Sequence, residues 1–226
     1  MTFGKWFSYE GVELFQHPTG PYSYVTRHMA LDADGSPRAY HPDGKSGLDA
    51  LANAGYPNKG WKSVLAVDPA HPDKPYVQPS GPNAGFFVSK TSLHDLHAAA
   101  TDASAYVNSE KVPYLVFPGN FYAVRGTGGY GDLAMARNLD NGCETFAIVA
   151  DGGPSRAPLG EVSLKLASAL GGQNPNPRNG AGIPKGRFQY LIFPKSRFNP
   201  AWPRGTGEMD AAARALLAAV GGWPTI

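Results

Sequence analysis

Two acidic residues, Asp151 and Glu161, lie on either side of a loop rich in Gly and Pro. An apolar run at 146–150 leads into Asp151, and Glu161 is expected to open a helix. Two carboxyl groups on one connection suit acid/base chemistry, in which a protonated group donates a proton and an ionised group activates water. An ordinary structural role is the alternative, because Asp before Gly favours a turn and Glu favours a first helical turn. Spacing alone leaves both interpretations open.

Six short segments rich in β-branched or aromatic residues are predicted to be the strands that position these groups. They are 63–67, 85–89, 114–117, 133–137, 145–150 and 188–193. Between the fourth and fifth strands, the Asn141-Gly142 pair tolerates positive φ and predicts a tight hairpin. Aromatic residues within 1–30 indicate further short strands or an ordered arm. The pattern therefore predicts an all-β core.

Helices are expected at 159–170 and 208–220, where apolar or Ala-rich residues recur at helical spacing and a Gly-Gly pair follows. A shorter helix is expected around 47–53. The loop 173–186 is long enough to line a cleft. The sequence shows no internal repeat and no linker, so a single domain spanning 1–226 is expected.

Composition narrows the possible partners. With 42% hydrophobic and 17% charged residues, the 226-residue chain is expected to be globular. Its formal net charge of +2 comes without a long run of Lys or Arg, so nucleic acid is not an expected partner. No apolar stretch is long enough to predict a membrane span. Cys143 is the single cysteine, so no internal disulfide is possible. We expect a monomer, and the lack of a secretory pattern in the first residues leaves the localisation open.

Five segments, in the same order, resemble motifs of glycoside hydrolase family 75, the chitosanases best known from fungi. Residues 29–35 (MALDADG) are similar to the family's DMDIDCDG stretch, and residues 150–163 are similar to its GDTxP…GEAS site. The other three segments are 112–118 (VPYLVFP), 131–136 (GDLAMA, similar to GNxAA) and 188–193 (FQYLIF). The expected family-like core is therefore about 28–194, with an N-terminal arm at 1–27 and a C-terminal helix at about 207–221 packed on it.

The resemblance implies a mainly β fold, a six-stranded, double-psi-like β-barrel with a few flanking α-helices. It also implies a secreted, endo-acting, inverting hydrolase of chitosan, a β-1,4-linked amino-sugar polysaccharide, with Asp151 and Glu161 as the catalytic pair and no cofactor. We favour Glu161 as general acid and Asp151 as general base. A helix N-terminus would lower the pKa of Glu161, so burial beside Leu159 and Val162 must outweigh that effect.

Asp32 and Asp34 match the family's Asp-rich segment, and we expect them to contact the protonated amines of the substrate. A simple turn before Gly35 is an equal alternative. Asp132 is a weaker candidate for substrate binding. No metal is expected, because the Asp-x-Asp-Gly run has Gly where a third calcium ligand should fall and lacks the closing Glu.

Three other functions stay open. The GxGxxG match at 126–131 would suit a nicotinamide-dependent oxidoreductase, but the sequence around it does not predict the required strand and helix. A non-catalytic carbohydrate-binding module would use aromatic platforms such as Trp61, Tyr130 or Trp202. A peptidoglycan glycan-strand hydrolase, acting as an exported antibacterial toxin, would suit a slightly basic chain without a secretory signal.

Overall fold

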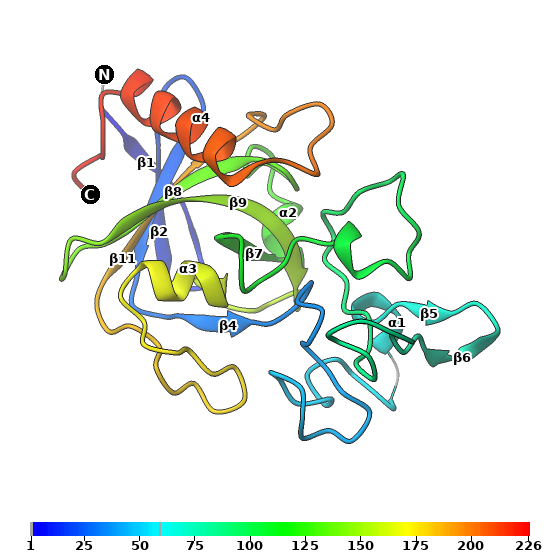
Figure 1. Cartoon of the computed structure of the whole chain (residues 1–226). Helices are drawn as coiled ribbons and strands as arrows, with labels where there is room; N and C mark the ends of the chain where they lie inside the picture. Colours follow the sequence, from blue (N-terminus) through cyan, green and yellow to red (C-terminus); the bar gives the residue numbers. More distant parts are fainter. Residues whose placement is uncertain (1, 59) are drawn as a thin grey trace.

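The computed structural model describes residues 2–58 and 60–226, which form a mainly β structure (Figure 1). Within these residues, nine strands make one mixed sheet in the order β1-β2-β3-β11-β8-β9-β7-β10-β4. These strands are β1 (Gly4–Tyr9), β2 (Val12–Gln16), β3 (Tyr22–Thr26), β4 (Ala30–Asp32), β7 (Tyr114–Pro118), β8 (Leu133–Asn138), β9 (Glu144–Gly153), β10 (Glu161–Ser163) and β11 (Phe188–Phe193). A separate ribbon pairs β5 (Val67–Asp68) with β6 (His71–Pro75).

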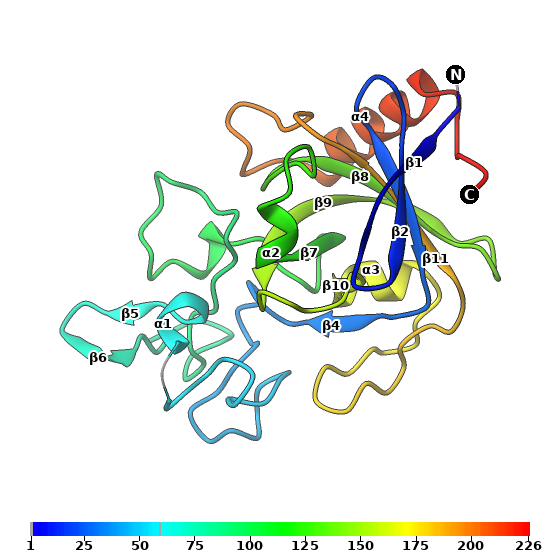
Figure 2. The same cartoon turned by 180° about the vertical axis from the view of Figure 1, so that it is seen from behind.

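The helices of the described ranges are short except for the last one. They are α1 (Trp61–Val64), α2 (Gly119–Tyr122), α3 (Leu164–Ala169), α4 (Thr206–Ala219) and a 3-10 turn at Ala103–Ala105. Figures 1 and 2 show α4 lying along β8 and β9, whereas the long connection between β4 and β7 spreads to one side of the sheet. None of these helices is long and apolar enough to cross a bilayer.

Both faces of the central strands are buried. Along β7, Leu115 and Phe117 belong to one apolar cluster, whereas Tyr114 and Val116 belong to another. The second cluster includes Met209, so α4 covers that face of the sheet. A strand covered on both faces is apolar at consecutive positions, which explains the YLVFP run of β7.

Four of the six predicted strands are confirmed as β7, β8, β9 and β11, and the hairpin between β8 and β9 is confirmed by their antiparallel pairing. The predicted C-terminal helix is confirmed as α4. The segments 63–67 and 85–89 are wrong as full strands: the first is partly taken up by α1, and the two meet at an isolated bridge between Leu65 and Ser89. Gly and Pro at 79–85 limit further pairing there.

The short helix expected at 47–53 is replaced by bends and turns. Asp49 accepts hydrogen bonds from the backbone N–H of Ala50 and from the side-chain amide of Asn53. Local bonds of this kind favour a turn over a helix. The result is a loop that presents Asp49 next to the sheet.

The helix predicted at 159–170 is wrong in its first part. Residues 161–163 form β10, which pairs antiparallel with β7 and parallel with β4. The helix α3 begins only at Leu164, where the side chain of Ser163 accepts a hydrogen bond from the N–H of Leu166. Apolar residues before and after this junction pack in one cluster, so their spacing resembled that of a single helix.

The closed six-stranded barrel is not confirmed. The pairing order begins at β1 and ends at β4, and among the described residues no ladder joins these two strands. Of the two alternatives for residues 1–30, short strands or an ordered arm, the structure has the strands: this segment supplies β1, β2 and β3, and β3 pairs antiparallel with β11. Together with β4 and β10, these three strands are the five members of the sheet that were not among the six predicted segments.

Candidate active site

Asp151 and Glu161 flank the same residue of the central strand β7. Val116 pairs with Asp151 of β9 on one side and with Glu161 of β10 on the other. Paired residues of neighbouring strands point to the same face of a sheet, so both carboxylates project from the face of Val116. Two strand spacings of about 4.8 Å each separate their backbones. The sequence prediction that these two residues share a site is therefore consistent with the strand register.

A β-bulge puts Asp151 on this face. Leu115 pairs with Val149, but the next residue, Val116, pairs with Asp151, so Ala150 is the extra residue on β9. Without the bulge, Val116 would lie opposite Ala150, and Asp151 would point to the other face. The bulge sits at the point where β9 leaves the apolar core and reaches the Gly152-Gly153 pair.

The two carboxylates line one cavity of about 490 Å³ together with three further acidic residues. Asp32 and Asp34, expected as substrate contacts, lie here, and Asp49 lies here too. Sequence analysis missed Asp49, because an Asp in a turn-rich segment has no distinctive motif. The complete lining is Leu31, Asp32, Asp34, Tyr40, Asp49, Asn53, Ser63, Val64, Val116, Asp151, Gly152, Gly153, Pro154 and Glu161.

Asp151 is buried but well supplied with hydrogen-bond donors. Its Oδ1 accepts bonds from the backbone N–H of Ser92 (3.0 Å), the hydroxyl of Ser92 (2.6 Å) and the N–H of Gly152 (2.7 Å). Burial raises the pKa of Asp151, whereas these donors and the nearby ammonium of Lys90 act in the opposite direction. The site therefore contains specific support for the ionised form of this carboxyl.

Glu161 has a different environment. Among the residues that the structure describes, no donor forms a hydrogen bond with its carboxylate, and burial together with the charges of Asp151 and Asp49 raises its pKa to about 7. Because Glu161 lies on β10 and not at a helix start, the pKa lowering expected from a helix N-terminus does not apply. Burial raises the pKa of both carboxyls, but only Asp151 has donors that oppose the rise, and such a difference in surroundings can separate an acid from a base.

Asp32 and Asp34 fit both of the interpretations that the sequence allowed. Asp32 accepts a hydrogen bond from the N–H of Asp34 (2.8 Å), which makes a turn, and the hydroxyl of Ser89 donates to Asp34 (2.9 Å). The turn continues at Gly35, where φ is +72° and a Cβ would meet the carbonyl oxygen of Val107 at 2.1 Å. Burial and neighbouring carboxylates raise the pKa of both Asp32 and Asp34 well above the usual range.

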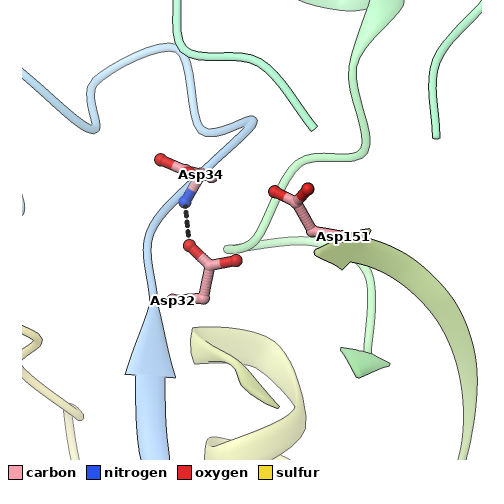
Figure 3. Close-up of side chains that lie close together, drawn as sticks. All are labelled: Asp32, Asp34 and Asp151. Carbon is pink, nitrogen blue, oxygen red and sulfur yellow. Dashed lines mark hydrogen bonds between the residues drawn. The ribbon is translucent and has the colours of Figure 1, made fainter. Parts of the chain in front are cut away.

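Figure 3 shows Asp32, Asp34 and Asp151 converging from β4, the turn after it and the end of β9. Each offers one carboxylate oxygen, and these oxygens all lie within 4.8 Å of one another. Carboxylate oxygens are the donors that hard divalent cations prefer. The expectation of no metal relied on a local loop pattern, which does not detect a ligand as distant in sequence as Asp151. These three residues are the set that could hold a cation. Protonation of one or more of the carboxyls would also reduce their repulsion.

Asp132 does not join this site, so its assignment to substrate binding is wrong. It is 2% exposed and does not line the acidic cavity. Its carboxylate accepts bonds from the N–H of Gly129 (2.8 Å) and the N–H of Arg197 (3.1 Å), so it stabilises the glycine-rich loop. That loop follows α2 and leads into β8, which is not the strand-loop-helix order that a dinucleotide-binding fingerprint needs.

The three aromatic residues considered as sugar platforms lie outside the acidic cavity. Trp61 is 6% exposed and packs in a core cluster, so it is not a platform. Tyr130 packs against Tyr122 at a ring separation of 4.8 Å. Trp202 lines a separate cavity of about 370 Å³ that Ser92 also lines.

No family model matches this chain, and a search of curated proteins finds no significant match.

Proposed function

We propose that the chain is an endo-acting glycoside hydrolase that cleaves a β-1,4-linked amino-sugar polysaccharide, with chitosan as the preferred substrate. The observation that carries the proposal is the placement of Asp151 and Glu161 on either side of Val116, in one cavity and on one face. Hydrolysis of a glycosidic bond needs two carboxyls in this kind of arrangement.

Glu161 is the general acid and Asp151 is the general base in this mechanism. A pKa of about 7 keeps much of Glu161 protonated in mildly acidic solution, so it can donate a proton to the leaving oxygen. Asp151 keeps three donors on Oδ1 and accepts a proton from water. Inverting enzymes place their carboxyls about 6.5–9.5 Å apart to accommodate that water, and the backbones of Asp151 and Glu161, two strand spacings or about 9.6 Å apart, are close to the upper end of this range.

The acidic lining supports a cationic substrate. Asp32, Asp34 and Asp49 line the cavity beside the catalytic pair. A cleft focuses the field of its own lining, so a negative cavity attracts protonated glucosamine even though the whole chain has a formal net charge of +2.

The resemblance to family 75 also implies a six-stranded double-psi core. The strands that would correspond to it are β11, β8, β9, β7, β10 and β4.

Purified protein incubated with partly acetylated chitosan should release oligosaccharides that mass spectrometry identifies. Glu161→Gln and Asp151→Asn should each lower the rate by about 10²–10⁴-fold, because each keeps the shape of the side chain and removes its proton chemistry. Glu10→Gln and Asp73→Asn are matched controls, since both positions are exposed and neither lines the cavity. Near-normal turnover by either site variant would remove that residue from the mechanism.

A parallel incubation with purified bacterial sacculi tests the second substrate, the glycan strand of peptidoglycan. Its backbone also consists of β-linked amino sugars, but most of its amines are acetylated, so it lacks the positive charge that the cavity favours. Release of glycan fragments from sacculi alone would replace chitosan by peptidoglycan. No release from either polymer, with binding retained, would favour a carbohydrate-binding module.

A further inference from the structure

Ser92 reaches the candidate site from a segment that the sequence motifs do not include. Backbone hydrogen bonds hold this segment before and after Ser92. The N–H of Lys90 donates to the carbonyl of Val64 (2.7 Å), and the N–H of Leu93 donates to the carbonyl of Ala150 (2.8 Å). The Leu93 bond ties the segment to the bulged residue directly before Asp151. Ser92 is therefore held in place by neighbours that also determine the position of the catalytic strand.

Both hydrogen bonds from Ser92 reach the same oxygen of the Asp151 carboxylate. Both its N–H (3.0 Å) and its hydroxyl (2.6 Å) donate to Oδ1, and the N–H of Gly152 adds a third bond to the same atom at 2.7 Å. Within the described part of the chain, Oδ2 receives no hydrogen bond. Three donors on one oxygen fix the rotation of the carboxylate and leave the other oxygen available to a ligand or water.

We propose that Ser92 is a positioning residue for the reaction, which holds Asp151 through Oδ1 so that Oδ2 is the oxygen that takes the proton from the attacking water. This inference rests on the proposed glycosidase function. Ser92 does not contact the reacting atoms; it acts through Asp151. Its two bonds also stabilise the negative charge of the carboxylate, which is what a general base requires.

Ser92 is one of several groups that affect the ionisation of Asp151. The ammonium of Lys90 favours the ionised carboxylate, whereas the neighbouring acidic groups oppose it. The groups that interact with Asp151 are Asp32, Asp34, Lys90, Tyr114, Tyr122 and Glu161. The donors to Asp151 favour its ionised form, although burial still raises its pKa.

The test is Ser92→Ala in the full chain, measured with chitosan. Loss of one charge-assisted hydrogen bond should lower kcat by about tenfold or more, with little change in KM. The acidic limb of the kcat profile should move to higher pH by about one pH unit, because Asp151 now needs a higher pH to ionise. Ser92→Thr keeps the hydroxyl and should restore both values. An unchanged kcat and pH profile in Ser92→Ala would overturn the proposal.

Ser104 provides a matched control. Its N–H (2.8 Å) and hydroxyl (2.7 Å) both donate to Oδ1 of Asp102, which is the same pattern at an exposed 3-10 turn. Ser104→Ala should therefore leave kcat and its pH profile unchanged. A loss equal to that of Ser92→Ala would show that general destabilisation, and not the position of Asp151, explains the effect.

A second measurement separates this inference from the glycosidase proposal. In protein with ¹³C-labelled Asp, the carboxyl resonance of Asp151 can be assigned from the spectrum of Asp151→Asn and titrated without substrate. Ser92→Ala should raise the titration midpoint of Asp151, and Ser92→Thr should not. A raised midpoint in a protein that cleaves no glycan would keep the role of Ser92 and reject the function. An unchanged midpoint would reject the role of Ser92 whatever the activity.

Discussion

The carboxylate of Glu161 lies against Gly153, so closely that a Cβ on this glycine would be 2.8 Å from Oε2. Gly153 is the last residue of β9, and Glu161 is the first residue of β10. The side chain of Glu161 therefore occupies space that any other residue at 153 would fill. This relationship gives the Gly152-Gly153 pair a role in the site beyond that of a turn.

Gly153→Ala should displace the carboxylate of Glu161 and lower kcat by about tenfold or more, because small displacements of catalytic groups are costly. The melting temperature should change little, since the clashing atom is at the end of a flexible side chain. Gly4→Ala is the control, because a Cβ there meets nothing within 4 Å. Full activity in Gly153→Ala would show that the acid tolerates a different position.

The rate of hydrolysis should fall as the pH rises through about 7, the pKa to which burial and neighbouring carboxylates raise Glu161. A general acid works only while it is protonated, so its ionisation produces the alkaline limb of the profile. Initial rates measured from acidic to mildly alkaline solution test this. A rate that increases above neutral pH would reverse the roles of Glu161 and Asp151.

Asp34→Asn should raise KM for glucosamine-rich chitosan by about tenfold. A bound substrate amine would offset the raised pKa of Asp34 and favour its ionised form, and the variant loses this charge-assisted contact. The same variant should show little change in KM for a highly acetylated substrate, which has few charged amines. Comparing the two substrates separates loss of charge recognition from a general defect. An equal increase in KM for both would mean that Asp34 supports the shape of the site and does not recognise charge.

The sequence predicted the strands with the strongest apolar pattern and missed the features set by pairing. Four strands are buried apolar runs bounded by turn residues, and their composition is sufficient to predict them. They are β7, β8, β9 and β11. Strand β10 has three residues, and only its partners β7 and β4 distinguish it from the start of α3. The bulge at Ala150 has no sequence signature at all, yet it determines the face of Asp151.

The candidate site was also predicted only in part: residues in local motifs were found, and residues placed by tertiary contacts were not. Asp151 and Glu161 were predicted from a local motif, and Asp32 lies in the same cavity as expected. Asp132 was misassigned because an Asp that accepts backbone N–H groups in a turn looks the same in sequence as one that faces a cavity. Asp49 and Ser92 come from loops whose places depend on long-range hydrogen bonds, which a single sequence does not reveal.

Chelation with EDTA should leave hydrolysis unchanged, because the proposed chemistry uses carboxyl groups and water alone. The experiment matters because Asp32, Asp34 and Asp151 each place one oxygen within 4.8 Å of the others. Protein should be dialysed against chelator and assayed with and without added Ca²⁺ or Mg²⁺. Loss of activity that either ion restores would show that a cation, and not shared protons, neutralises these carboxylates.

Glu161→Gln should make the protein more stable than the wild type in mildly alkaline solution but not in acid. Burial and nearby carboxylates raise the pKa of Glu161 from 4.5 to about 7, so the folded state holds this proton more tightly than the unfolded chain does. The stability that Glu161 contributes is therefore fully present below a pH of about 4.5 and is lost as the pH rises through about 7. Gln does not ionise and avoids this loss, so the gap in the free energy of unfolding should widen by about 1–3 kcal/mol. Urea unfolding at several pH values measures it, with exposed Glu10→Gln tracking the wild type. A gap that stays constant with pH would mean that Glu161 ionises as readily in the fold as in the unfolded chain, and it would then be ionised near neutrality and have no proton to donate.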